Sequence, residues 1–137
     1  MKEVVHARGH DHVRAEHTST FEVTTDDWLT PAGDCIVAVE ADRAPADFAD
    51  AFVAACQSAD ATVTAELTVG DHSQTVVGSG HPDLTFESER SAVARTSDYV
   101  DERTVLTDAD SPALGIDRNL VRELTEGADL TLTLTVE

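Results

Sequence analysis

Three histidines and a cysteine lie close together near the start of the chain and could carry acid–base, thiol or metal chemistry. His10, His12 and His17 precede Cys35 within the segment 8–40. Histidine changes its charge near neutral pH. A cysteine becomes a nucleophile when its pKa falls and a base lies within reach. The segment therefore predicts a catalytic site if the fold brings His17 and Cys35 together.

The alternation of apolar and polar residues separates these histidines. From Val13 to Thr25 the pattern has period two, which predicts a half-buried strand. His17 then shares the apolar face with Phe21, whereas His12 lies on the polar face and is expected at the surface. His17 is interpreted either as a buried histidine bonded to the backbone or as an acid–base or ligand residue lining a cleft.

Cys35 follows a Gly33-Asp34 corner at the start of an apolar run. A strand end is a common place for site residues, so Cys35 is a candidate nucleophile with His17 or His10 as its base. The alternative is a small buried side chain, and this is the interpretation for Cys56. Asp34 is expected either to cap its own turn or to orient a histidine.

A metal interpretation uses the same residues. His10 and His17, with Cys35 or Asp34 as a third ligand, would suit a divalent transition metal such as zinc. No CxxC pair, HExxH or nucleotide-binding glycine motif supports a particular cofactor. The cofactor is otherwise unknown.

Three arginines occur in the otherwise acidic segment ESERSAVARTSDYVDERT. Arg90, Arg95 and Arg103 are expected to pair with neighbouring carboxylates. Alternatively they converge on a phosphate or carboxylate, which the guanidinium fork binds well. Arg95 with Ser97 is the first candidate for such a substrate-binding pair, and Arg103 is the next.

The elements that must position these residues indicate an α+β fold. We expect one domain over residues 1–137, without an internal repeat, built as a largely antiparallel sheet or open barrel packed by two helices. The helices are predicted to begin at Pro45 and at Ser111-Pro112. The strands are predicted at 13–25, 35–41, 62–69, 73–77, around 84–86, 92–99, 104–107 and 130–136.

The charge of the chain predicts its surroundings rather than its function. There are 27 acidic and nine basic residues, giving a net charge of −18, and the only lysine is Lys2. Dispersed carboxylates with so little lysine are typical of a protein in very high salt, where their repulsion is screened. No apolar run could span a membrane and no signal peptide is recognised, so we expect a cytoplasmic, halophilic protein without a membrane partner.

Five segments of the chain resemble a family of small archaeal proteins that is classed as a domain of unknown function. They are GH at 9–10, EHTSTFEVT at 16–24, LTPAGDCIVAV at 29–39, SDYVDERT at 97–104 and DRNLVREL at 117–124. The resemblance implies a cytosolic, haloarchaeal protein and no established activity. His12 and Thr96 depart from the family, which carries Asn and Lys there. The matching candidate residues are His10, His17, Asp34, Cys35, Ser97 and Arg103.

Two functions remain open on this sequence. The first is a small enzyme that uses His17, Cys35 and Asp34 on a small polar or phosphorylated substrate. The second is a non-catalytic module that binds RNA or a protein partner through its arginines. In a high-salt protein the negative charge does not exclude nucleic acid. The oligomeric state is not indicated.

Overall fold

Two four-stranded sheets form the protein, and the computed structural model describes all 137 residues. Sheet A is antiparallel throughout. Sheet B pairs two central antiparallel strands and carries one parallel strand at each edge. In spatial order, sheet A holds β1 (Lys2–Arg8), β8 (Asp129–Val136), β4 (Thr62–Val69) and β5 (His72–Ser79), and sheet B holds β3 (Ile36–Ala38), β2 (Thr20–Thr24), β6 (Ser91–Arg95) and β7 (Thr104–Leu106).

The two sheets pack against each other and bury one continuous apolar core. Thirty-five buried residues form this core. A single bridge joins the sheets at each edge, Arg8 with Val39 and Ser79 with Thr107, so they do not close into a continuous barrel. The fold class predicted from the sequence, an α+β fold with mostly antiparallel strands packed by two helices, is confirmed.

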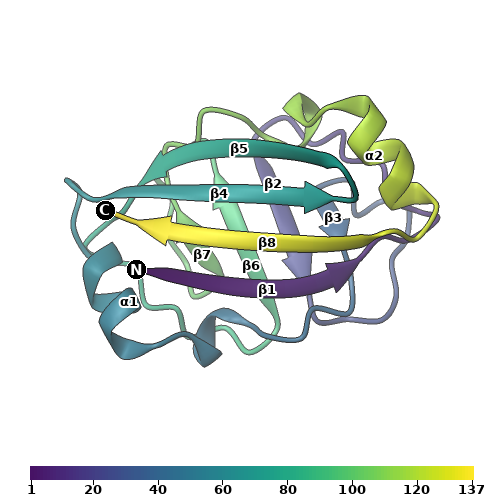
Figure 1. The fold of residues 1–137 in the computed structure, drawn as a ribbon. Helices are drawn as coiled ribbons and strands as arrows, with labels where there is room; N and C mark the ends of the chain where they lie inside the picture. Colours follow the sequence, from purple (N-terminus) through teal and green to yellow (C-terminus); the bar gives the residue numbers. More distant parts are fainter.

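Two short helices lie at opposite ends of the sheets (Figure 1). Each follows a single turn of 3-10 helix: η1 (Pro45–Asp47) precedes α1 (Asp50–Cys56), and η2 (Ala113–Gly115) precedes α2 (Arg118–Thr125). Neither helix is long and apolar enough to cross a membrane. In α2 the side chain of Asp117 caps the first turn by accepting the Asn119 backbone N–H at 2.7 Å. Because a 3-10 turn comes first in each case, the α-helices begin at Asp50 and Arg118, later than the starts predicted at Pro45 and Ser111-Pro112.

The second half of the chain repeats the first. Each half runs through three strands, a 3-10 turn, an α-helix and a fourth strand, in the same order. Positive φ angles recur at corresponding places: 50° at Ala15 and 54° at Phe86, then 54° at Glu40 and 50° at Asp108. The expectation of no internal repeat was wrong. The two halves share their backbone geometry, but they share few side chains, so the sequence did not reveal the repeat.

Hydrogen bonds make the correspondence residue-specific. The backbone N–H of Asp42 donates to the carbonyl of His6, and Oδ1 of Asp42 accepts the His6 N–H; Asp110 and Val77 make the same two bonds in the second half. The central pairs Glu22–Val93 in sheet B and Glu66–Thr133 in sheet A each join two corresponding residues. An approximate two-fold axis therefore passes through both sheets. The repeat provides an internal comparison between corresponding residues. A feature that both halves share is explained by the fold, whereas a feature found in only one half needs another explanation.

Several predicted strands were wrong in their extent. The strand predicted over 13–25 begins only at Thr20, because Ala15 takes a left-handed backbone conformation that ends the extended chain. Leu84 and Phe86 are buried as expected, but the segment 84–86 is not a strand, since Phe86 has the same left-handed conformation. The strand β1 was not predicted. The hairpin of β4 and β5 and the last strand, β8, are confirmed.

Candidate functional site

Most of the candidate residues lie on the outer face of sheet B. Thr20 lies between two of them, His17 and Cys35. Its hydroxyl and backbone N–H both donate to Nδ1 of His17, at 3.0 and 3.1 Å, and the same side chain lies near the Cys35 thiol, where it acts weakly against the rise in that pKa. The fold thus brings His17 and Cys35 to the same threonine.

His17 has a structural role that its counterpart shares. Its Nδ1 also accepts the Ser19 backbone N–H at 3.3 Å, so this nitrogen is an acceptor and carries no proton. In the second half Ser88 occupies the same place, and its hydroxyl accepts the N–H groups of Arg90 and Ser91, both at 3.1 Å. A serine can therefore replace the ring as the cap of this turn. His17 is half-buried and lies outside any strand.

Cys35 is held as a neutral thiol. Burial and the charge of Glu22 raise its pKa to about 11. The thiol donates to Oε1 of Glu22 at 3.9 Å, and Nη1 of Arg103 lies 3.8 Å from the same oxygen. Burial also raises the pKa of Cys56, to about 12. Neither thiol has the lowered pKa that nucleophilic catalysis requires.

Arg95 and Arg103 share one carboxylate. Both guanidinium groups donate to Oδ2 of Asp101, at 3.0 and 3.1 Å, and Arg95 also donates to the hydroxyl of Thr104 at 2.8 Å. Burial alone would raise the pKa of Asp101, but hydrogen bonds from Arg103 and the charges of both arginines outweigh it and hold that pKa below its ordinary value. The arginines therefore already have an anionic partner. We refer to these groups, from His17 through Thr20, Cys35, Glu22, Arg103 and Asp101 to Arg95, as the sheet B network.

The remaining predicted residues lie around this network or away from it. Asp34 takes part through its backbone carbonyl, which accepts the N–H groups of Glu16 and His17. Ser97 is exposed, and its hydroxyl accepts the Tyr99 backbone N–H at 3.3 Å. His10 is grouped with Asp11 and His12, and His17 is not part of that group.

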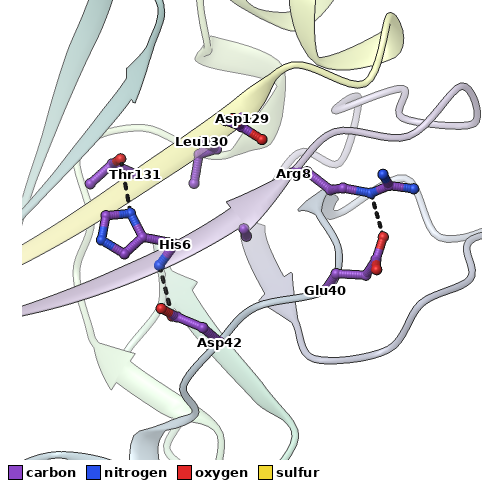
Figure 2. A pocket seen from close by; sticks show the side chains of 8 residues that line it. His6, Arg8, Glu40, Asp42, Asp129, Leu130 and Thr131 are labelled. Carbon is purple, nitrogen blue, oxygen red and sulfur yellow. Dashed lines mark hydrogen bonds and ion pairs between the residues drawn. The ribbon is translucent and has the colours of Figure 1, made fainter.

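An open depression of about 510 Å³ lies on the outer side of β1 and β8, away from the network (Figure 2). Its ion pair joins Arg8 to Glu40, and Thr131 reaches Nδ1 of His6 at 3.4 Å. His6, which has no role assigned from the sequence, lies on β1, a strand that the sequence pattern did not predict. The polar groups of this depression largely bind one another, which leaves little for a ligand.

Two exposed aromatic side chains were also missed. Trp28 and Tyr99 are the only Trp and Tyr of the chain, and they are 56% and 58% exposed. They occupy corresponding positions in the loops after β2 and β6, where Thr25 and Thr96 make equivalent backbone bonds to Arg90 and Ser19. Each follows an exposed aspartate, Asp27 or Asp98, that forms no ion pair. The recurring pattern Thr-x-Asp-aromatic was the available signal.

Comparison with known proteins gives the family of the chain. The sequence profile described as Domain of unknown function (DUF371) matches residues 5–137. The chain belongs to the DUF371 family. An uncharacterised protein from Methanocaldococcus jannaschii is 35% identical over 136 residues, which cover 99% of this chain and 100% of the relative. The relative is archaeal, as the resemblance in the sequence implied, and its description assigns it no activity.

The state of Cys35 in this DUF371 protein can be measured by alkylation. At pH 8 we expect native Cys35 to react with iodoacetamide roughly a hundredfold more slowly than in the unfolded chain, because a thiol of pKa about 11 stays protonated. Peptide mass spectrometry separates it from Cys56. Glu22→Gln should speed the reaction, since it removes a charge that raises the pKa. Equal rates in the native and unfolded chains would contradict a neutral thiol.

Proposed function

We propose that this DUF371 protein is a non-catalytic binding protein that engages basic side chains of a protein partner through the loops carrying Trp28 and Tyr99. The observation that carries the proposal is the pair Asp27-Trp28 and Asp98-Tyr99. Both halves of the chain retain an exposed aromatic residue behind an unpaired aspartate at the same place in the fold.

The enzyme hypothesis has less support. A small enzyme using His17, Cys35 and Asp34 on a polar or phosphorylated substrate needs a thiolate or a free base. The pKa of Cys35 is raised by burial and Glu22, and Nδ1 of His17 is engaged by backbone N–H groups. Asp34 contributes its backbone rather than its carboxylate to hydrogen bonding.

Exposed aromatic rings beside free carboxylates suit a cationic side chain. Lysine and arginine are attracted to the faces of Trp and Tyr rings, by about 0.5–1 kcal/mol at exposed sites. A neighbouring carboxylate adds attraction of the same sign. Within the protein Tyr99 already shows this preference, since the guanidinium carbon of Arg95 lies 4.8 Å from its ring centre.

The charges favour a basic protein over RNA. Arg90 is paired with Asp26 through contacts of 2.6 to 3.0 Å, and Arg95 and Arg103 are paired with Asp101. No free cluster of cations is left to neutralise phosphates, which supply most of the affinity for nucleic acid. The net charge of −18 has the sign that attracts a basic segment.

Calorimetric titration with a deca-arginine peptide tests the proposal at moderate and at molar KCl. The double variant Trp28→Ala/Tyr99→Ala keeps the net charge, so attraction by charge alone is unchanged while the ring contacts are lost. We expect binding to weaken about tenfold, the sum of two exposed cation–π contacts.

A matched control removes exposed apolar side chains from elsewhere. Val77 and Leu114 are 39% and 49% exposed, and Val77→Ala/Leu114→Ala should bind the peptide as the unchanged protein does. Equal affinity in both double variants would show attraction by charge alone and overturn the proposal. Tight binding of an oligouridine with none of the peptide would favour RNA and also overturn it.

A further inference from the structure

A turn built around histidine follows the first strand of each half. In the first half Nδ1 of His10 accepts the backbone N–H of His12 at 3.0 Å, and in the second half Nδ1 of His81 accepts that of Asp83 at 3.0 Å. The backbone bond from Val13 to the carbonyl of His10 also recurs in the second half. The fold therefore explains a histidine at the first position of the turn.

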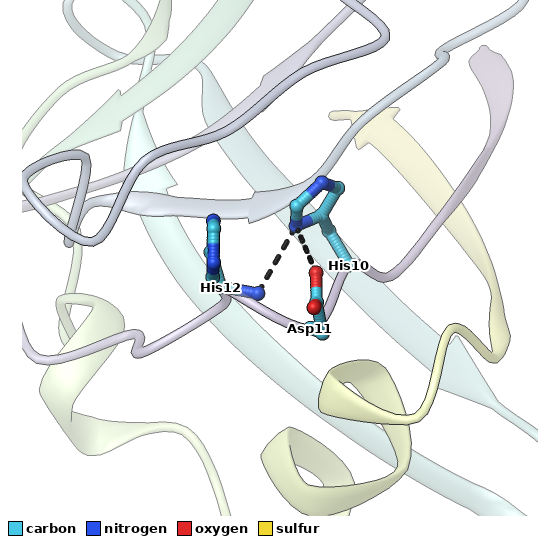
Figure 3. Close-up of side chains that lie close together, drawn as sticks. All are labelled: His10, Asp11 and His12. Atoms are coloured by element: carbon cyan, nitrogen blue, oxygen red, sulfur yellow. Dashed lines mark hydrogen bonds and ion pairs between the residues drawn. The ribbon is translucent and has the colours of Figure 1, made fainter.

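The fold does not explain the next two residues. Where the second half has Pro82 and Asp83, the first half has Asp11 and His12, so its turn carries a second imidazole as well as a carboxylate. One ligand atom from each of His10, Asp11 and His12 lies within 4.8 Å of the other two (Figure 3). The second half offers no such group.

The ring of His12 is held in the form that binds a metal. Its Nδ1 lies 2.7 Å from the backbone carbonyl oxygen of Leu29, which can only accept, so Nδ1 carries the proton. The other nitrogen, Nε2, then has a free lone pair. A histidine that donates one ring N–H to a backbone carbonyl is the usual arrangement of a metal ligand.

His10 has two incompatible neighbours at one ring nitrogen. Its Nδ1 lies 3.0 Å from the N–H of His12, a donor, and 3.0 Å from Oδ1 of Asp11, an acceptor. With Nδ1 unprotonated, as the bond from His12 requires, its lone pair and the Asp11 carboxylate lie side by side, and a bound cation would stabilise that arrangement. His81 lacks this close contact, since Oδ2 of Asp83 lies 3.9 Å from its Nδ1.

We propose that His10, Asp11 and His12 form a binding site for one divalent transition metal ion, with zinc as the fitting case. The site uses Nδ1 of His10, Nε2 of His12 and a carboxylate oxygen of Asp11, and the ion takes the place of the His12 backbone N–H at Nδ1 of His10. Two imidazoles and a carboxylate are a common ligand set for zinc and iron, at bond lengths of about 2.0–2.2 Å. Asp11 is 80% exposed, so its side chain can rotate to meet the ion.

Calorimetric titration with Zn²⁺ alone, on protein without a histidine tag, tests the site. We expect one ion per chain. His12→Asn keeps an N–H donor for Leu29 but removes the ring, and it should weaken binding at least a hundredfold. Asp11→Asn should weaken it about tenfold. His81→Asn, at the matched position of the second half, and His72→Asn, beside Glu123, should bind as the unchanged protein does.

Paramagnetic Co²⁺ gives an independent measurement by NMR. Ring signals of His10 and His12 should broaden or shift before those of His72 and His81. Circular dichroism confirms that each variant is folded before it is titrated. No binding, or binding weakened equally by His81→Asn and His12→Asn, would overturn the proposal.

Discussion

Gly9→Ala is expected to destabilise the protein by about 3 kcal/mol or more. A methyl group at this position would overlap the carbonyl oxygen, carbonyl carbon and Cα of Leu124, and these backbone atoms cannot move without displacing α2. Overpacking against fixed backbone belongs to the large destabilising effects. Gly80→Ala should behave alike, because its methyl would overlap the carbonyl oxygens of Cys56 and Ser58 at the end of α1. Urea unfolding followed by circular dichroism measures both.

The matched control for these glycines is Gly33→Ala. Its nearest contact would be Cδ1 of Leu29 at 2.9 Å, the end of a flexible side chain. We expect a loss below about 1 kcal/mol, because the leucine can rotate. Equal losses of stability at Gly9 and Gly33 would show that the backbone of Leu124 in α2 does not pack closely against Gly9.

Phe52→Ala is expected to lower the free energy of unfolding by about 3–5 kcal/mol. Phe52 is 2% exposed and meets Phe48 and Phe86 edge-on, with ring centres 5.8 and 6.1 Å from its own. Truncation leaves a cavity between α1 and the loop that carries Phe86. Thermal and urea unfolding would measure the loss.

The internal repeat supplies the control for Phe52. Leu120 occupies the corresponding position of α2 and is fully buried, so Phe52→Leu should lose less than about 1.5 kcal/mol. Similar losses for the alanine and leucine variants would mean that the ring contacts, rather than buried volume, determine stability here.

The elements that could be predicted are those with an uninterrupted pattern. The hairpin 62–79 and the final strand alternate cleanly, and the structure has both. The segment 13–25 alternates just as well, yet a left-handed residue at Ala15 ends its extended course. An alanine gives no indication of that conformation, so the alternating pattern alone could not predict where the strand begins.

The grouping of the candidate residues was predictable only in part. Cys35 and His17 do reach one threonine, but that depends on the parallel pairing of β2 with β3, which brings Glu22 opposite Ile36. The pairing of Arg95 and Arg103 with a carboxylate was expected, and Asp101 provides it. The partners of His10 depend on a three-residue turn that no periodicity describes.

The strands of the two halves alternate in sheet A, since β1 and β4 come from the first half and β8 and β5 from the second. Half of the chain alone would leave β4 without β8 and β2 without β6. The fold is therefore one that a half-length polypeptide could reach only by assembling with a second copy of itself. Joining the copies through the Gly70-Asp71 turn turns a homodimer into a monomer and lets each side of the axis evolve separately. Glu22 opposite Val93 is one outcome, because a symmetric dimer would have to place two glutamates, or two valines, at that spot.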